Sequence, residues 1–341
     1  MIKIDGSYGE GGGQILRTAL GLSVLTNKPV EIYNIRKNRS NPGIKPQHFS
    51  AIKIIQQICD AETSGLSVGS NKLVFKPNEV KQGKYNFDIG TAGSVTLVFQ
   101  AIILSVLNSN KKIEFNLVGG TDVKWSPSWD FFEKVFLGLL NKIGVKVESN
   151  LKKRGYYPKG GGEAYIKINP VSKIIPLKLQ NSNFNKVQGL VHISDLPDHI
   201  NKRIKHTAVK TLLKEDINAE IHTQRCQTNS PGVGITLWIK NSNMFLGSCV
   251  IGERGVSSET VGKKAAEKII NETEKNATLD VYSFDQIVPY LALASEKGIS
   301  KCYISRVSKH AETNMWFVKK FLDVDFDLIY KDKGIEVNVH T

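Results

Sequence analysis

The sequence has few cysteines, and no two of them lie close together. Cys59, Cys226, Cys249 and Cys302 are the only four in 341 residues, and none belongs to a C-x-x-C pair. This spacing argues against a structural zinc site and against a disulfide framework. There is no apolar run of about 18 residues, so we expect no membrane span. The first residues, MIKIDGSYGEGGG, have neither the basic nor the apolar segment of a signal peptide, and we therefore expect a cytoplasmic protein.

Acidic residues are also in deficit. The 32 Asp and Glu face 46 Lys and Arg, which gives a formal net charge of +14, and the excess is spread along the chain. Such a balance favours an anionic partner, either a nucleic acid, a nucleotide or both. A basic surface kept for solubility would give the same count. Hydrophobic residues make up 40% of the chain, which predicts an ordinary packed core, and the length is enough for two domains.

One order of elements is predicted three times along the chain. Residues 2–75, 85–168 and 277–339 each read as strand, helix, strand, helix, strand, strand. The third unit is expected to open with a strand over residues 277–282. The three units match in pattern rather than in identity, which indicates an internal repeat. Alternating strands and helices predict an α/β fold with right-handed crossovers.

The segment between the second and third units does not follow this order. Residues 184–276 predict a smaller inserted α/β domain, because the segments that enter and leave it are polar. We therefore expect a large domain made of residues 1–183, with the first two repeats and the start of the third, and of residues 277–341, with the remainder of the third repeat. A basic amphipathic helix in the insert, around Lys205, could touch nucleic acid, but a solvated face is the commoner case.

A glycine-rich segment precedes the first predicted helix. It reads GEGGGQILR from Gly9 to Arg17. Glycines before a helix let backbone N–H groups approach an anion, and the N-terminus of the helix favours negative charge. Glu10 in such a loop suits a Mg²⁺ ligand, and Arg17 would lie in the first turn. A flexible turn, with Glu10 well placed at a helix start, explains the segment equally well.

Corresponding loops of the three units carry polar residues that could converge. In the first unit the loop holds Arg36, Arg39 and Gln47, and two arginines three residues apart suit forked contacts to phosphate. In the second unit the loop holds Pro127 and nearby aromatics that could flank a base. In the third unit it holds His310. A solvated basic loop is the commoner case for the arginine pair taken alone.

His310 is the candidate nucleophile. It lies between the predicted strand at residues 302–305 and the helix that follows, and such turns reach ligands at the edge of a sheet. We expect the neighbouring Arg306 and Lys309 to keep the imidazole neutral, which leaves a nitrogen lone pair free to attack phosphorus. Most isolated histidines are structural, so position alone does not assign this role.

Two further stretches are candidates for nucleoside contacts. Gln100 lies on an otherwise apolar helix face and either joins a buried network or contacts a ligand. The segment Tyr282, Ser283, Phe284, Asp285 and Gln286 combines an aromatic ring, a carboxylate and an amide near a helix start. Asp285 could be only an N-cap, and Tyr282 only a core residue.

Several separate motifs, in order along nearly the whole chain, resemble the RNA 3′-terminal phosphate cyclase family. They are GEGGGQILR at 9–17, IRKNRSNPG at 35–43, GTAGS at 90–94 with Gln100, GGTD at 119–122, GYYPKGGG at 155–162, Asp285-Gln286, and His310 followed by Thr313-Asn314. The resemblance implies a large domain of three βαβαββ repeats, like the C-terminal domain of translation initiation factor 3, with a smaller inserted α/β domain.

The resemblance also implies an activity and its substrates. The enzyme would use ATP, with Mg²⁺ or Mn²⁺, to convert the 3′-phosphate end of an RNA to a 2′,3′-cyclic phosphodiester. His310 would attack the α-phosphorus of ATP to form a histidyl–AMP. AMP would pass to the RNA 3′-phosphate, and the 2′-hydroxyl would close the ring and release AMP. The oligomeric state, monomer or homodimer, stays open.

The resemblance assigns roles to the candidate residues. His310, Arg17 and Glu10 would be catalytic, and Glu10 would bind the metal. ATP would contact Arg36, Arg39, Gln47, Gln100, Pro127, Tyr282, Ser283, Phe284, Asp285 and Gln286, with adenine between Pro127 and Tyr282. The alternative is a non-catalytic cyclase-like RNA-binding factor in ribosome assembly, a branch that lacks the nucleophilic histidine. His310 with its flanking residues favours the enzyme.

Overall fold

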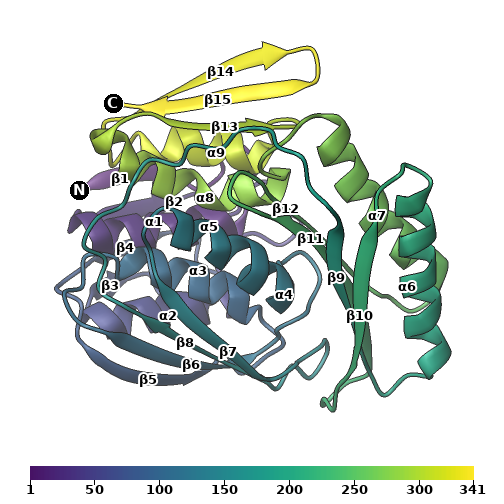
Figure 1. The fold of residues 1–341 in the computed structure, drawn as a ribbon. Coiled ribbons are helices and arrows are strands. Elements are labelled where there is room, and N and C mark those ends of the chain that lie inside the picture. The colour runs from purple at the N-terminus through teal and green to yellow at the C-terminus, as the bar shows by residue number, and fades with distance from the viewer.

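The computed structural model describes all residues 1–341. Its first unit forms a four-stranded sheet with two helices on one face (Figure 1). The elements are β1 (Ile2–Asp5), α1 (Gly13–Thr26), β2 (Val30–Tyr33), α2 (Pro46–Cys59), β3 (Glu62–Ser64) and β4 (Leu73–Lys76). The strand order is β1-β2-β4-β3, with β1 and β2 parallel and the other pairs antiparallel.

The second unit has the same topology. Its elements are β5 (Gly83–Asp88), α3 (Val95–Ser105), β6 (Ile113–Gly119), α4 (Trp129–Phe131), a π-helical turn (Phe132–Phe136), α5 (Leu137–Lys142), β7 (Val147–Lys153) and β8 (Gly162–Ile168). The strand order is β5-β6-β8-β7, again with only the first pair parallel. The predicted α/β class is confirmed, whereas the likeness to initiation factor 3 stays a prediction.

The third unit departs from the prediction at its start. It contains α8 (Val281–Ala294), a 3₁₀ turn (Ser295–Lys297), β13 (Ser300–Ile304), α9 (Lys309–Val318), β14 (Asp325–Lys331) and β15 (Gly334–His340). The strand expected over residues 277–282 is wrong, because the Asp280 carboxylate accepts hydrogen bonds from the N–H groups of Tyr282 and Ser283 and so starts a helix. The parallel partner of β13 is instead the stretch around Lys178, which precedes the insert.

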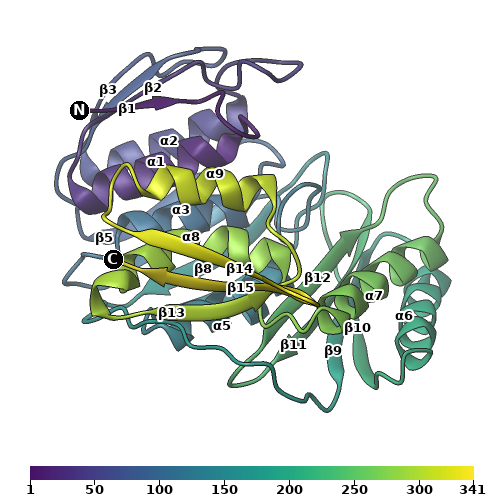
Figure 2. The same cartoon turned by 90° about the horizontal axis from the view of Figure 1, so that it is seen from above.

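Residues 187–274 form a sheet and a helix pair of their own, beside the three units (Figures 1 and 2). The elements are β9 (Val187–Ser194), α6 (Asp198–Leu213), β10 (Ala219–Arg225), β11 (Gly232–Lys240), β12 (Phe245–Ile251) and α7 (Ser258–Glu274). The strand order is β10-β9-β11-β12, and 18 buried apolar residues make a separate core. The proposed boundaries at 183–184 and 276–277 stay a prediction. We call residues 184–276 the inserted segment.

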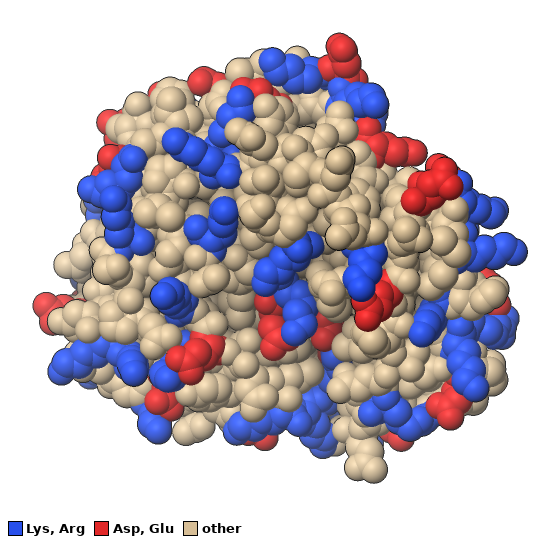
Figure 3. Space-filling model, viewed as in Figure 1, with Lys and Arg blue, Asp and Glu red and all other residues tan.

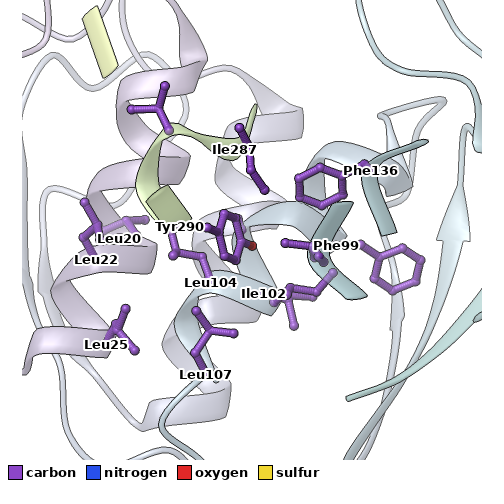
Figure 4. Packing of buried hydrophobic residues seen from close by; sticks show 14 of the residues in the cluster. Leu20, Leu22, Leu25, Phe99, Ile102, Leu104, Leu107, Phe136, Ile287 and Tyr290 are labelled. Atoms are coloured by element: carbon purple, nitrogen blue, oxygen red, sulfur yellow. The ribbon is translucent and has the colours of Figure 1, made fainter. Parts of the chain in front are cut away.

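The main core joins all three units through their helices. It contains 68 buried apolar residues. Figure 4 shows Leu20 of α1, Ile102 and Leu104 of α3, and Tyr290 of α8 gathered in this core. Helix α1 packs against both α3 and α9, and α8 packs against α9. The three units are therefore fixed relative to one another, which holds the loops at the ends of these helices in place.

The surface is basic without being uniformly so. On the face drawn in Figure 3, Lys and Arg side chains are scattered and mixed with Asp and Glu rather than gathered in one patch. No helix is both long and apolar enough to cross a membrane.

Candidate active site

A cleft of about 670 Å³ lies where the three units and the inserted segment meet. Every residue predicted for the site lines it, except Ser283 and Phe284. Ser283 is buried, and its hydroxyl donates to Asp280, while Phe284 is fully buried in the main core. Ser283 and Phe284 point away from the cleft because they lie on the inner face of α8.

Glycines form one wall of the cleft, before α1. Gly9 and Gly11 both have φ of +59°, a left-handed conformation that favours glycine. A Cβ on Gly9 would lie 2.2 Å from the Thr313 hydroxyl of α9, and one on Gly13 would lie 2.1 Å from Nε2 of His48. The loop is therefore packed tightly between α9 and α2. Its tightness brings the partly positive N-terminus of α1 to the cleft.

His310 lies directly over this helix start. Its Nε2 is 2.8 Å from one carboxylate oxygen of Glu10, and the other oxygen accepts a hydrogen bond of 2.6 Å from Arg39. A Cβ on Gly12 would lie 3.5 Å from Arg39 and 4.0 Å from His310. Ser308 caps α9 and so fixes the first turn that carries the imidazole. The structure thus brings together three predicted residues that are far apart in the sequence.

The pKa of His310 is lowered, chiefly by burial. Arg17 and Arg39 lower it as well, whereas Glu10 opposes them. The expectation that Arg306 and Lys309 supply the positive charge is wrong, since the cations that act on the ring come from the first unit. The contact between Nε2 and a carboxylate oxygen requires a proton on Nε2. Nε2 becomes a nucleophile only after Glu10 releases it and that proton leaves.

Arginines line the part of the cleft beside His310. Burial lowers the pKa of Arg17 to about 10, and it also lowers the pKa of Arg36. Neither guanidinium forms an ion pair, and Nε of Arg36 is buried without a hydrogen-bond partner. Gln47 lies alongside, in the first turn of α2. Unpaired guanidinium groups facing a cleft form a site for an anion such as a phosphate chain.

His48 is a residue that the sequence reasoning missed. It is 4% exposed and lines the same cleft. Burial, followed by Arg17, Arg36 and Lys45, lowers its pKa to about 3, so the ring is neutral. Its Nδ1 accepts the N–H of Lys45, which places its proton on Nε2. In the sequence, only its position next to Gln47, a predicted site residue, indicated that His48 could line the cleft.

The far end of the cleft carries the aromatic and amide groups. Tyr282 is 47% exposed, and both it and Pro127 line the cleft, with the Pro127 carbonyl accepting a hydrogen bond from Thr96. Gln100 donates to Gln286 from the facing helix. Tyr282 is therefore not a core residue, whereas a ligand contact of Gln100 stays a prediction.

Asp285 is not the N-cap of its helix, a place that Asp280 takes. Its carboxylate accepts the hydroxyl of Ser308, and its carbonyl accepts a hydrogen bond from Asn314. Burial, with the nearby Asp280 charge, raises the pKa of Asp285 to about 7. The carboxyl group therefore links α8 to the cap of the helix that carries His310.

The inserted segment also contributes to the cleft, which the sequence did not predict. Cys249 of β12 and Lys268 of α7 line it, and the Lys268 ammonium lies 5.5 Å from the centre of the Tyr282 ring. Trp125, 93% exposed, stands at the mouth. No local motif marks these residues, because they enter the cleft only through the packing of β12 and α7 on the second and third units.

The acidic residues of the cleft fit one divalent cation. Glu10 and Asp285 are the only carboxylates among the lining residues, and Mg²⁺ bound with ATP typically takes one or two carboxylates plus phosphate oxygens. A second group, Asp122, Asp130 and His192, lies outside the cleft. Arg154 already pairs with Asp122 at 3.1 Å and with Asp130 at 2.9 Å, so this group does not suit a metal.

Comparisons with known proteins agree on one family. The family model described as RNA 3′-terminal phosphate cyclase matches residues 8–328. Proteins named RNA 3′-terminal phosphate cyclase from Methanosarcina barkeri and Korarchaeum cryptofilum are both 43% identical to the chain. The first alignment covers 99% of this chain and 100% of the relative, and the second 95% and 93%.

A protein of the same name from Pyrococcus furiosus is 39% identical, over 98% of this chain and 96% of its own length. The family match, residues 8–328, includes the glycine loop, the arginine loop and His310. The chain belongs to the RNA 3′-terminal phosphate cyclase family.

Proposed function

We propose that this protein converts RNA 3′-phosphate ends to 2′,3′-cyclic phosphodiesters at the expense of ATP, through a covalent histidyl–AMP. The observation that carries the proposal is the position of His310, which lies over the N-terminus of α1 and beside Arg17 and Arg39. A purely RNA-binding role would not need a histidine with a depressed pKa beside Arg17, a buried guanidinium without an ion pair. The named relatives favour the enzyme over the non-catalytic alternative.

In the first step Nε2 of His310 forms a bond to the α-phosphorus of ATP, and the bond to pyrophosphate breaks. Arg17, Arg36, Arg39 and Gln47 would hold the phosphate oxygens as charge develops on them. A divalent cation at Glu10 would neutralise further charge. Nε2 can attack once its proton has passed to solvent, which leaves the lone pair free.

In the second step an oxygen of the RNA 3′-phosphate attacks the phosphorus of AMP, and the bond to His310 breaks. In the third step the 2′-hydroxyl attacks the RNA 3′-phosphorus, and AMP leaves with the bonding electrons. Adenylation is needed because a phosphate monoester is a poor electrophile without a good leaving group. Adenine would lie between Pro127 and Tyr282, with Gln100, Asp285 and Gln286 around the nucleoside.

The test is to incubate the protein with ATP labelled at the α-phosphate and with Mg²⁺. We expect a labelled adduct that is stable to alkali and labile to acid, as a phosphoramidate is. His310→Ala should abolish it, while the control His340→Ala, at a half-buried histidine on β15, should not. An unlabelled wild type, or equal labelling of both variants, would refute the proposal. Cytoplasmic location and oligomeric state stay predictions.

A further inference from the structure

The segment Gly155–Gly162, GYYPKGGG, has no role in the nucleotide cleft, although it resembles the family as closely as the other motifs do. Its tip is built for exposure. Tyr157 is 76% exposed, and Pro158 and Lys159 are exposed beside it, while Tyr156 and Gly160 on either side are buried. An exposed tyrosine side chain buries little apolar surface and so contributes little to the stability of the fold. A binding role would explain its position.

The base of this loop is held firmly. The Tyr156 hydroxyl lies 2.6 Å from Nδ1 of His192, and the Lys159 N–H donates to the Ser230 hydroxyl. A Cβ on Gly161, where φ is +67°, would lie 2.2 Å from the Asn229 amide nitrogen. The loop is therefore clamped against the inserted segment. A rigidly presented aromatic ring and ammonium lose little conformational entropy when they bind a partner.

The loop is continuous with the phosphate end of the cleft. A Cβ on Gly160 would lie 3.0 Å from Cα of Ala92 and 3.1 Å from the carbonyl oxygen of Thr91. Two residues further along that loop, a Cβ on Gly93 would lie 3.3 Å from Cβ of Gln47. Residues 91–93 therefore lie between Gln47 on one side and Gly160, at the base of the tip, on the other.

The geometry of the second step predicts where the RNA strand lies relative to this loop. An in-line displacement at the phosphorus of histidyl–AMP brings the RNA 3′-phosphate in opposite His310, by the path along which pyrophosphate left. Under the proposed function the phosphate groups along that path contact Arg17, Arg36, Arg39 and Gln47, and of these residues Gln47 is the one that packs against residues 91–93. The RNA strand behind its terminal phosphate must then continue outward from Gln47, and the 91–93 loop and the tip lie next to it.

We propose that the tip Tyr157–Lys159 binds the RNA strand just upstream of the 3′-phosphate. Tyr157 stacks on a base, and Lys159 contacts a backbone phosphate. Stacking and charge together give affinity without sequence preference, as in other single-strand sites. Lys159 is free for this because it forms no ion pair. Lys152 and Arg225 are each already paired with a carboxylate, whereas the exposed Lys153 donates only to the Asn229 amide oxygen.

The inference rests on RNA being the substrate, so its test separates RNA binding from adenylation. Binding of a fluorescent 3′-phosphorylated oligoribonucleotide is measured by anisotropy, and adduct formation with labelled ATP is measured in parallel. Tyr157→Ala should weaken RNA binding by about 5- to 150-fold, the range for one lost base stack. Tyr157→Phe should restore it. Adduct formation should be unchanged in both.

Matched controls come from the β14–β15 hairpin, where Tyr330 is 73% exposed and Lys333 is exposed. Tyr330→Ala should leave RNA binding unchanged. Lys159→Gln should make the binding less dependent on salt, by about one unit of the log–log slope, and Lys333→Gln should not. Tyr157→Ala should also raise KM for the oligonucleotide but not for a nucleoside 3′-phosphate, which is too short to reach the tip.

The outcomes distinguish the two proposals. If wild type forms the adduct and Tyr157→Ala binds RNA as tightly as Tyr330→Ala does, the tip is not an RNA site. If Tyr157→Ala loses adduct formation as well, its effect is structural and the inference is equally overturned. If wild type forms no adduct, the proposed function fails, whatever the tip binds.

Discussion

The contact between Glu10 and His310 makes a prediction that needs no substrate. Glu10→Gln should lower the pKa of His310. The carboxylate is the only neighbour that raises this pKa, against burial, Arg17 and Arg39. A glutamine keeps the size of the side chain and can still accept from Nε2, but it no longer attracts the imidazolium.

The expected size follows from the distance. Two unit charges 2.8 Å apart interact by about 1.5 kcal/mol at the dielectric constant of water. Both side chains are more than a quarter exposed, so salt screens the interaction, and the energy equivalent of the pKa decrease should be of this order or smaller. The decrease should shrink as salt is raised to about 1 M, where the screening length is about 3 Å.

The assay is an NMR titration of the His310 imidazole in selectively labelled protein without metal or nucleotide, with His310→Ala to assign the signal. Glu312→Gln is the control, since Glu312 is an exposed carboxylate two residues away on the same helix. We expect a lower pKa in Glu10→Gln and no change in Glu312→Gln. A pKa that stays the same or rises in Glu10→Gln would show that the carboxylate does not hold the ring.

Four further predictions concern activity and stability. Arg39→Ala should reduce kcat/KM of cyclisation at least 10-fold, since it removes a phosphate contact, and Lys205→Ala by less than about twofold; equal losses in steady-state assays would contradict the site. Gly13→Ala should cost about 1–3 kcal/mol in chemical denaturation, because its Cβ would meet His48. Arg154→Met should cost about 3–5 kcal/mol, because it leaves two buried carboxylates unpaired. Burial raises the pKa of Glu272 to about 7, so the native state binds this proton more tightly than the unfolded state does. The free energy of unfolding should therefore fall as pH rises from about 4.5 to 7. Glu272→Gln should be more stable than wild type at pH 8, by at most about 3 kcal/mol, and equally stable at pH 4.

The sequence predicted the loops of the site better than their electrostatics. The glycine segment, the arginine loop and His310 were recognisable because each has an unusual composition at the start of a helix. Which cations face His310 was mispredicted, because Arg306 is close in sequence whereas Arg17 and Arg39 are close only in the fold. Arg306 instead acts on the carboxyl groups of Asp285 and Glu272.

The third unit shows a second limit of sequence patterns. The apolar residues of 277–282 suit a strand, and only the hydrogen bonds of the Asp280 carboxylate make them the start of a helix. The stretch that pairs with β13, around Lys178, is separated from it by the whole inserted segment. A search for repeats of constant spacing cannot find a pairing of this kind.

The inserted segment lines the nucleotide cleft and also contacts residues that hold the Pro127 loop in place. Asp122 accepts the backbone N–H of Trp129, which anchors the loop that carries Pro127, and Arg154 binds Asp122. Arg154 is held in turn by Gln224 of β10. Asp122, Trp129 and Arg154 are buried, whereas Gln224 is exposed, so the costly link to break is the one between Arg154 and Asp122. A change in the inserted segment should therefore reach the proposed adenine wall through Arg154, so the position of Pro127 depends on a part of the chain that the three-unit pattern does not include.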